Sequence, residues 1–559
     1  MKFVKYLAVL ALGLCAFASN SHAQTAFIGG GSSAIALEIG QAAATSALTN
    51  TPCVWTQGKT ASIVARDNRS AATIPFDSQG QIFVTWNKGA GVDCNHPANP
   101  GVVIYSYMNL DSVIGDRCYF INDGSGSTGC LQVMTIAANT AGQSLLPGIT
   151  DSTGGIPAFI ISALNNAHFT YIGTDVRPED AKFASLRMFT PCGTPVWRQP
   201  FDQGERENYG LGYQTVTTGV GTPVLSTFST ASFPVLDFNI TGTDPITSLA
   251  VPSYGVYAVG AQPMMIAVSP IGGTGIGAAT DINGFTLALF QQGVLGRSTD
   301  LFGPTTTNPV DTLIREPLSG TYNTMEFSIP NTSQFHTQQE DQNCNGSGGT
   351  LTNPLLLQST NGAIVAARRR VIGTGEMVKQ LQLATFGDTL GYFFWSSANA
   401  TGLTNVKYLT VNGVDPIQDT YTGGVLPGNG GVPLTNVTFK WLNMGDYAIW
   451  SPVRIVSATP EPAGIANLIT AAQTAPLTSV DMIPLSNLKV WKSHFSIPAI
   501  NIVYGANGTT ISSANDLCNS AGALAEFGGD AGGASIGKQS NLDFCADYGN
   551  VTGLVNKTN

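Results

Sequence analysis

The stretch Arg315-Glu316-Pro317-Leu318-Ser319-Gly320-Thr321 decides how the rest of this chain is interpreted. It follows Thr312-Leu313-Ile314, which predicts a short strand, and it precedes a short helical pattern. Pro317 suits a turn from strand to helix, and the side chain of Ser319 or Thr321 can cap that helix. N–H groups at a helix start favour an anion, and an arginine adds a permanent cation with a planar fork of donors. The stretch therefore predicts either an anion site or an ordinary capped helix.

Residues 1–23 have the pattern of a signal peptide. Lys2 and Lys5 precede an apolar run that is too short to span a bilayer, and a small-x-small pattern predicts cleavage after Ala23. We therefore expect an exported protein, periplasmic or secreted, without a membrane span in the mature chain. Loss of the two lysines leaves 23 basic residues against 35 acidic ones, a net charge of −12. This balance argues against nucleic acid and anionic membranes as partners.

The mature chain keeps eight cysteines, and an even number in an exported protein predicts disulfides. Their spacing predicts local bridges Cys53–Cys94, Cys118–Cys130 and Cys518–Cys545, which leaves Cys192–Cys344 as the fourth. The sequence has no C-x-x-C, and its mature histidines are scattered. We therefore expect no metal site and no cofactor.

Strand-like and helical patterns alternate along the chain, which predicts an α/β core with turn-rich decorations. Residues 49–117 and 183–250 are interpreted as insertions, the first forming a local β-rich lobe. A helix is expected after Gly129 through Met134, and Arg368–Arg370 is expected in a solvated turn. The strands expected in the core are 82–86, 102–105, 169–175, 264–268, 312–314, 390–395 and 447–456, and the main helices are 34–48, 377–383 and 463–475.

Four segments in order carry small, hydroxyl or charged residues directly after a strand pattern. Together they resemble the substrate-binding proteins of phosphate ABC transporters, which have a type II periplasmic-binding-protein fold. The glycine turn of that family is similar to Gly29–Ser33, and its G-x-G-S-[ST]-G turn to Gly124–Gly129. Its S-D after a strand is similar to Thr174-Asp175, and its R-x-x-x-S-G-T to Arg315–Thr321.

The resemblance implies a two-lobed α/β fold with mixed sheets and insertions. Lobe one would comprise residues 24–266 and 449–559, and lobe two residues 267–448. The implied phosphate-binding residues are Ser33, Ala34 (through its N–H), Ser127, Asp175, Arg315, Ser319, Gly320 and Thr321. The family carries an acid two residues after the arginine, where this chain has Pro317, so either Glu316 substitutes or Arg315 is held differently. Asp175 either accepts the proton that phosphate retains near neutral pH or caps the helical pattern that begins near Arg177.

The resemblance further implies a solute-binding protein rather than an enzyme. It would bind phosphate or a similar oxyanion between its lobes, act as a monomer and deliver the anion to an ABC transporter permease. Two alternatives stay open. An exported phosphatase would need a metal cluster or an activated nucleophile, and no histidine lies in a recognisable partner motif. A surface or adhesion protein that has lost transport would account for the uncharged, Gly/Thr/Asn-rich insertions.

Overall fold

The computed structural model of the 559-residue chain describes the two lobes and short parts of the connecting segments. It describes residues 24–48, 52–69, 76–88, 93–95, 101–125, 128–178, 181–182, 238–269, 275–283, 286, 309–316, 318–328, 355–358, 361–362, 364–371, 373–384, 388–430, 432–475, 479–488, 490–492, 503–504, 509–510, 550–551 and 554–556. The predicted signal peptide, Cys192–Cys344, Cys518–Cys545 and most of the 183–250 insertion lie outside these residues.

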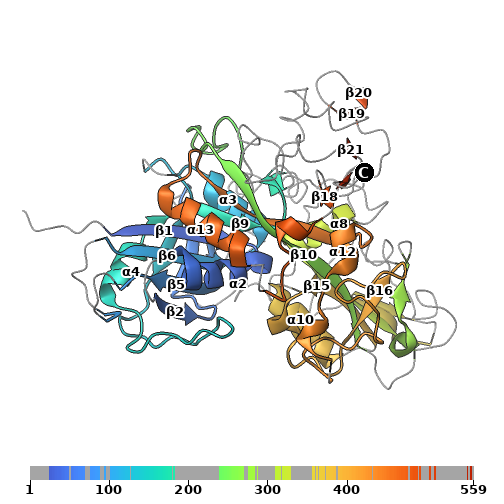
Figure 1. The fold of residues 1–559 in the computed structure, drawn as a ribbon. Helices are drawn as coiled ribbons and strands as arrows, with labels where there is room; N and C mark the ends of the chain where they lie inside the picture. Colours follow the sequence, from blue (N-terminus) through green and yellow to red (C-terminus); the bar gives the residue numbers. More distant parts are fainter. Residues whose placement is uncertain are drawn as a thin grey trace, which may run out of the picture.

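A single 13-stranded sheet runs through the molecule, and its long strand β10 (Gly255–Ser269) joins two lobes (Figure 1). The first part of β10 pairs antiparallel with β17 (Trp450–Ser457). From Met264 onward it pairs antiparallel with β15 (Asp388–Phe394). All residues of β10 are buried, because each lobe packs around one part of the strand. The predicted α/β fold with two lobes and mixed pairing is confirmed.

Lobe one is a three-layer arrangement of helices on both faces of a sheet. From β17 outward its strands are β9 (Tyr171–Thr174), β1 (Thr25–Gly31), β6 (Val103–Asn109), β5 (Gln81–Trp86) and β2 (Cys53–Gln57). One face packs against α2 (Ser33–Ala42), its π-helical continuation Ala43–Ala47, and α13 (Ala463–Thr474). The other face packs against α3 (Ser112–Phe120) and α4 (Ala158–Leu164). Side chains that alternate along each strand enter the two cores in turn.

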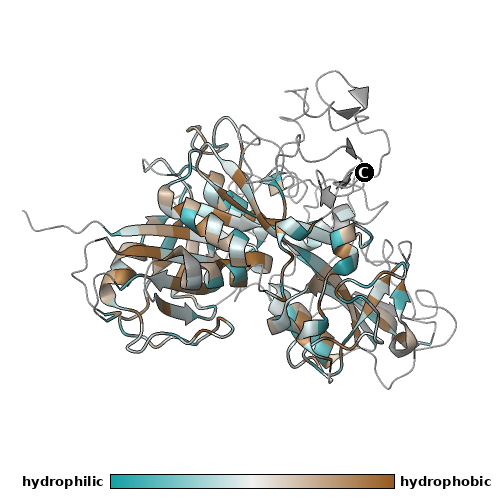
Figure 2. Cartoon of the chain, viewed as in Figure 1, coloured by the Kyte–Doolittle hydropathy of each residue, from teal (hydrophilic) through white to brown (hydrophobic). Residues whose placement is uncertain are grey.

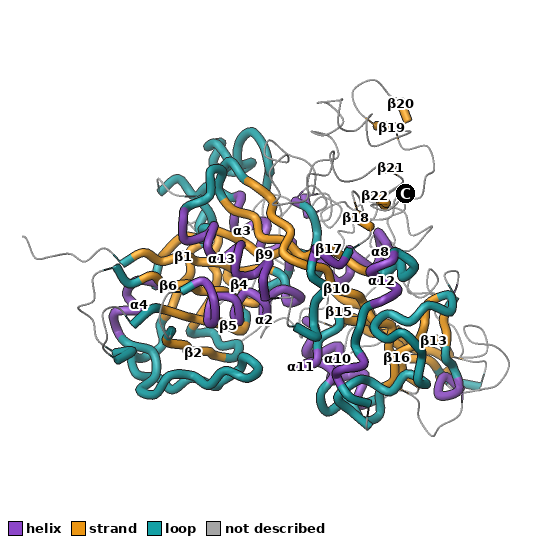
Figure 3. The backbone as a smooth tube through the Cα atoms, viewed as in Figure 1, coloured by secondary structure: helices purple, strands orange, loops and turns teal. Residues whose placement is uncertain are grey.

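Lobe two is built on β15 and a mixed set of neighbouring strands (Figure 3). Its strands are β12 (Val310–Arg315), β14 (Ile364–Val371), β13 (Leu355–Gln358), β16 (Lys407–Val411) and β11 (Asp281–Ile282). Its helices are α8 (Gly320–Ser328), α10 (Gly373–Leu383), α11 (Ser397–Ala400) and α12 (Lys440–Met444), with 3₁₀ turns at Gly275–Ala278, Leu434–Asn436 and Leu485–Asn487. Toward the C-terminus the structure also describes the short strands β18 (Val490–Lys492), β19 (Val503–Tyr504), β20 (Thr509–Thr510), β21 (Asn550–Val551) and β22 (Leu554–Asn556).

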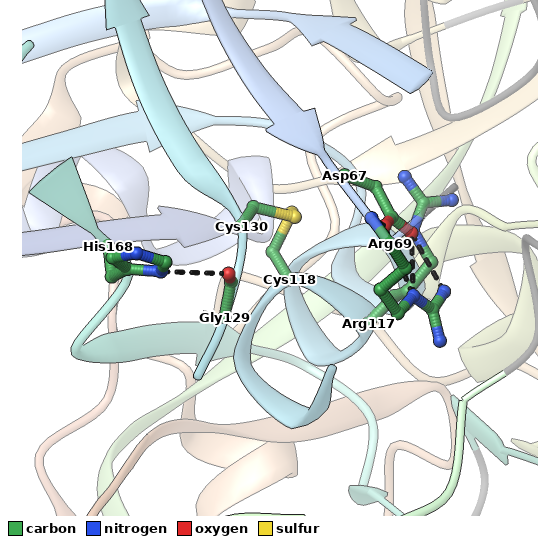
Figure 4. Close-up of a disulfide and its surroundings, with 7 residues drawn as sticks. All are labelled: Asp67, Arg69, Arg117, Cys118, Gly129, Cys130 and His168. Carbon is green, nitrogen blue, oxygen red and sulfur yellow. Dashed lines mark hydrogen bonds and ion pairs between the residues drawn. A yellow bond between two sulfur atoms is a disulfide. The ribbon is translucent and has the colours of Figure 1, made fainter. Parts of the chain in front are cut away.

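A small second sheet lies against lobe one and is tied down by covalent and ionic links. It comprises β4 (Phe76–Gln79), β3 (Ile63–Asp67), β7 (Leu131–Met134) and β8 (Ala167–His168). The disulfide Cys118–Cys130 joins the end of α3 to the residue before β7 (Figure 4). Next to it, buried Asp67 receives hydrogen bonds from Arg69, whose Nη1 also reaches Asp244 at 2.8 Å. The predicted bridges Cys53–Cys94 and Cys118–Cys130 are both confirmed.

Three expectations from the sequence are wrong. Residues 49–117 are no separate lobe, because β2, β5 and β6 from this stretch extend the main sheet next to β1. The segment after Gly129 is strand β7 rather than a helix, since it pairs with β3. Arg368–Arg370 belongs to strand β14 rather than a solvated turn, and Arg369 makes a buried ion pair with Asp311.

The buried apolar residues form three cores, one on each face of the lobe-one sheet and one in lobe two. Hydrophobic stretches run along the central strands, whereas the helices and outer turns carry hydrophobic and hydrophilic residues side by side (Figure 2). Within the described parts of the chain, none of the helices combines the length and apolarity needed to cross a bilayer. The same residues contain no group of three or more His, Cys, Asp or Glu side chains suited to hold a metal ion.

Candidate functional site

Four helices, two from each lobe, begin around the side chain of Arg315. In lobe one, α2 begins at Ser33 and α3 at Ser112. In lobe two, α8 begins at Gly320 and α10 at Gly373. The first N–H groups of a helix lack acceptors within the helix and carry partial positive charge. Their convergence makes this the region of the described chain best suited to an anion.

Arg315, the last residue of β12, connects these helix starts. Its Nη1 donates to Thr321 Oγ1 at 3.3 Å and to Thr374 Oγ1 at 3.1 Å. Its Nη2 lies 3.4 Å from Asp111 Oδ1, which precedes α3 in the other lobe. The side chain is only 1% exposed, and the backbone N–H donates to the hydroxyl of Tyr392. One buried guanidinium therefore links both lobes.

Glu316 braces the guanidinium in a bidentate pair. Arg315 Nε donates to Glu316 Oε2 at 2.7 Å, and Nη2 donates to Oε1 at 2.8 Å. Oε1 also accepts the backbone N–H of Gly373 at 2.9 Å. Burial by itself would raise the pKa of Glu316, but the Arg315 charge and its hydrogen bonds outweigh burial and lower the pKa to about 2. Of the two alternatives that Pro317 left open, the structure supports Glu316 as the brace.

Asp175 follows β9 and faces the start of α8 across the lobe boundary. The Ser112 hydroxyl donates to its Oδ1, and a Cβ added to Gly320 would overlap both of these oxygen atoms. Oδ2 accepts no hydrogen bond from the described residues. Burial raises the pKa of Asp175. Hydrogen bonds from Ser112 and Ser32 and the Arg315 charge act in the opposite direction, but burial outweighs them. The carboxyl group is thus buried, incompletely paired and directed at the opposite lobe.

The start of α2 meets the start of α10 on the open side of the site. Gly31 ends β1 with φ of 127°, a conformation that favours glycine and turns the chain into α2. Ser33 Oγ then lies 3.2 Å from Thr374 Oγ1. The N–H of Ala34 donates to the Ser32 side chain at 3.1 Å, which makes Ser32 the N-cap. An anion at Ala34 would therefore share this N–H with the cap.

Of the two capping residues that the sequence offers, Ser319 and Thr321, the structure has Ser319 at the start of α8. Its Oγ accepts the N–H of Tyr322 at 3.3 Å, and its carbonyl accepts the Asn323 side chain at 2.8 Å. Gly320 and Thr321 occupy the first positions of the helix. Of the two interpretations of the stretch, the capped helix is therefore real. The same helix start lies next to Arg315, where an anion site would need its N–H groups.

A cleft of about 500 Å³ opens next to these helix starts. Its lining includes Ser33, Ala34 and Asp111 from lobe one and Thr374 and Trp395 from lobe two. Arg315 is bonded to two of these lining residues, Asp111 and Thr374. The starts of α2 and α10 thus line one end of a space that both lobes share, and the guanidinium contacts that lining.

The structure brings together seven of the eight residues that the sequence singles out. Ser33 and Ala34 line the cleft, and Arg315 contacts the lining residues Thr374 and Asp111. Behind this lining, Thr321 contacts Arg315, Ser319 caps the helix that begins at Gly320, and Gly320 lies against Asp175. Ser127 is outside the described residues. Its described neighbours Ser125 and Thr128 belong to the turn beyond the far end of α3, whereas Ser112, at the near end, donates a hydrogen bond to the Asp175 carboxylate.

Sequence reasoning missed three residues of the site: Asp111, Ser112 and Thr374. The first two follow strand β6, which the sequence pattern places in an insertion outside the core, away from the motifs that carry the resemblance. Thr374 lies in Gly373-Thr374-Gly375, a small-residue turn before a helical pattern of the same kind as the other three. That signal was available in the sequence.

Solved structures similar to this chain are phosphate-binding proteins. A PstS from Borrelia burgdorferi is 16% identical, with a TM-score of 0.25 over 41% of this chain and 69% of that one. An ABC-type phosphate transport receptor from Vibrio cholerae is 12% identical, with a TM-score of 0.25 over 44% and 78%. A phosphate binding protein from Stenotrophomonas maltophilia is 13% identical, with a TM-score of 0.32 over 83% and 91%. No protein-family model matches the sequence, and neither does any curated protein. At these identities and TM-scores the similarity does not say which ligand this chain binds.

Proposed function

We propose that the chain is a solute-binding protein that holds a tetrahedral oxyanion, phosphate above all, between its two lobes. The observation that carries the proposal is the meeting of four helix N-termini around one buried arginine. Backbone N–H groups and a planar guanidinium are the donors that oxyanions bind best. Two helix starts come from each lobe, so an anion held by all four would favour the closed arrangement of the lobes.

The anion would enter from the cleft and replace contacts that the protein now makes with itself. Arg315 donates to the hydroxyls of Thr321 and Thr374 and lies near Asp111. Oxygen atoms of a bound phosphate are stronger acceptors for these donors than neutral hydroxyls. Glu316 would stay in place, because its two hydrogen bonds orient the guanidinium from the opposite edge.

Asp175 would make the site select phosphate over sulfate. Near neutral pH phosphate carries a proton and sulfate carries none, and an ionised carboxylate can only accept. Asp175 Oδ2 is a buried acceptor without a hydrogen bond from the described residues. It can receive the phosphate proton, whereas sulfate would present a bare oxygen to it. We include in the proposal export from the cytoplasm, a non-enzymatic role, a monomeric state and delivery of the anion to an ABC permease.

Equilibrium dialysis of the purified chain with labelled phosphate tests the proposal. Arg315→Ala should weaken binding by at least about tenfold, since a charge-assisted hydrogen bond contributes about 1.5–3 kcal/mol. That change also leaves two buried carboxylates without their partner, so Thr374→Val is the second variant and should weaken binding by several-fold. Arg66→Ala, which breaks a partly exposed pair with Asp77 elsewhere, is the matched control. Unaltered affinity in both site variants would refute the site.

Competition by sulfate tests the role of Asp175 separately. Unlabelled phosphate or arsenate should displace labelled phosphate from the unmodified chain, whereas sulfate should not. Asp175→Asn keeps the shape and adds a donor, so sulfate should now compete within about tenfold of phosphate, because the cost of an unpaired buried acceptor is about 1–3 kcal/mol. Equal exclusion of sulfate by the variant and the unmodified chain would leave Asp175 as a structural residue.

A further inference from the structure

The cleft continues beyond the anion end to a second group of polar side chains that the proposed function does not use. Glu38 on α2, Gln262 on β10 and Asp481 all line the same cleft. Glu38 is 3% exposed and Gln262 is 2% exposed. Within the described chain, Glu38 Oε1 and Gln262 Oε1 have no hydrogen-bond partner. Two buried acceptors in one cavity wall thus lack donors.

Two of the three residues, Gln262 and Asp481, are held in place by hydrogen bonds to lobe two. Gln262 Nε2 donates to the carbonyl of Trp395 at 2.6 Å and to that of Asp481 at 3.2 Å, which fixes the amide and turns its oxygen away from both. Asp481 accepts the backbone N–H of Ser397 at 2.6 Å. Burial, followed by the nearby Asp481 carboxylate, raises the pKa of Glu38 to about 8. A cation bound beside Glu38 would favour the ionised carboxylate and so act against both effects.

We infer that this end of the cleft binds an ammonium group, and that the ligand is an aminoalkyl ester of phosphate. The inference rests on the proposed function for the phosphate end. An ammonium group has three N–H donors and no acceptor, which fits a wall of acceptors. The described residues hold no group of acids or histidines suited to a metal ion, which disfavours a bare metal as occupant.

The size and spacing of the cleft support a ligand larger than inorganic phosphate. A cleft of about 500 Å³ lies in the range of about 300–1,000 Å³ that holds whole organic ligands. Glu38 follows Ala34 by four residues, one turn of α2, so the two lie on the same side of the helix about 6 Å apart along its axis. A short carbon chain between phosphate and ammonium spans such a distance.

Calorimetric titration of the full chain with a matched set of phosphates tests the inference. It is done at about pH 5, because a phosphate monoester has a second pKa of about 6 and then still carries the proton that Asp175 would accept. Phosphoethanolamine has a phosphate and a primary ammonium, ethyl phosphate lacks the ammonium, and phosphocholine keeps the charge but has no N–H. Phosphoethanolamine should bind at least about tenfold more tightly than either of the others, or about 1.4 kcal/mol. Glu38→Gln should reduce this preference to a few-fold, and so should the independent variant Asp481→Asn.

The control is Glu461→Gln, the same change at a glutamate that accepts a hydrogen bond from Tyr257 away from the cleft, and it should keep the full preference. Binding of phosphate with equal affinity for all three esters would overturn the ammonium site and leave the proposed function standing. Equal binding of phosphocholine and phosphoethanolamine would overturn the N–H contact. If Glu38→Gln and Asp481→Asn both keep the preference for phosphoethanolamine, these two residues do not bind the ammonium group. Absence of binding for every phosphate would overturn the proposed function together with this inference.

Discussion

Replacement of Glu316 by glutamine should destabilise the protein through a single buried charge. Glu316 is fully buried and makes two short hydrogen bonds to Arg315 and one to the N–H of Gly373. Glutamine has nearly the same shape but no charge. Arg315 would keep its charge in the interior and lose its shorter ion pair, whereas the longer contact to Asp111 would remain.

Two routes give the same magnitude for this change. On folding, the pKa of Glu316 falls from its ordinary 4.5 to about 2, with Arg315 opposing the effect of burial. A tenfold change in acidity corresponds to about 1.4 kcal/mol, so the ionised side chain contributes about 3 kcal/mol at neutral pH. Removal of one partner from a buried ion pair costs about 3–5 kcal/mol. We therefore expect Glu316→Gln to lower the free energy of unfolding by about 3 kcal/mol.

Urea unfolding without phosphate, followed by far-ultraviolet circular dichroism, measures the effect against the control Glu461→Gln. The folded-state pKa lies below the unfolded one, so the stabilisation is complete above about pH 4.5 and is lost as the pH falls toward 2. The difference in the free energy of unfolding between the unmodified chain and Glu316→Gln should therefore decrease over that pH range. A gap under about 1 kcal/mol at pH 7, or one that does not narrow in acid, would refute the ionised buried pair.

Two further predictions follow from the same region. Gly320→Ala places a methyl group against Asp175, so the lobes should separate slightly and phosphate affinity should fall at least about tenfold. Small-angle scattering measures the radius of gyration. An unchanged radius together with an unchanged affinity would contradict this prediction. Burial and then Asp481 raise the pKa of Glu38 from 4.5 to about 8, so the folded state binds an extra proton between these values and stability should fall as the pH rises from about 5 to 8. Glu38→Gln should remove this dependence of stability on pH, as measured by thermal unfolding. If the dependence persists in the variant, another titrating group causes it.

The local elements of this fold could be predicted from the sequence because they depend on neighbouring residues. The helix expected at 34–48 is present as α2 and its π-helical extension, and α13 ends within one residue of its prediction. Strand β12, the Ser319 cap and α8 follow from one contiguous stretch. The bridges Cys53–Cys94 and Cys118–Cys130 each join cysteines that are consecutive in the sequence, 41 and 12 residues apart, so their order and spacing predict them.

The remaining features were decided by contacts between residues far apart in the chain. The segment 131–134 is short and apolar, so its pattern fits a helix or a strand, and only pairing with β3 makes it β7. Three arginines in a row are typical of a solvated surface, but Asp311, 58 residues before Arg369, allows that side chain to be buried in β14. Asp111 and Thr374 reach Arg315 because β10 crosses between lobes and brings their helices together. Sequence patterns report which segments can form helix starts, whereas strand order alone decides which of those starts meet.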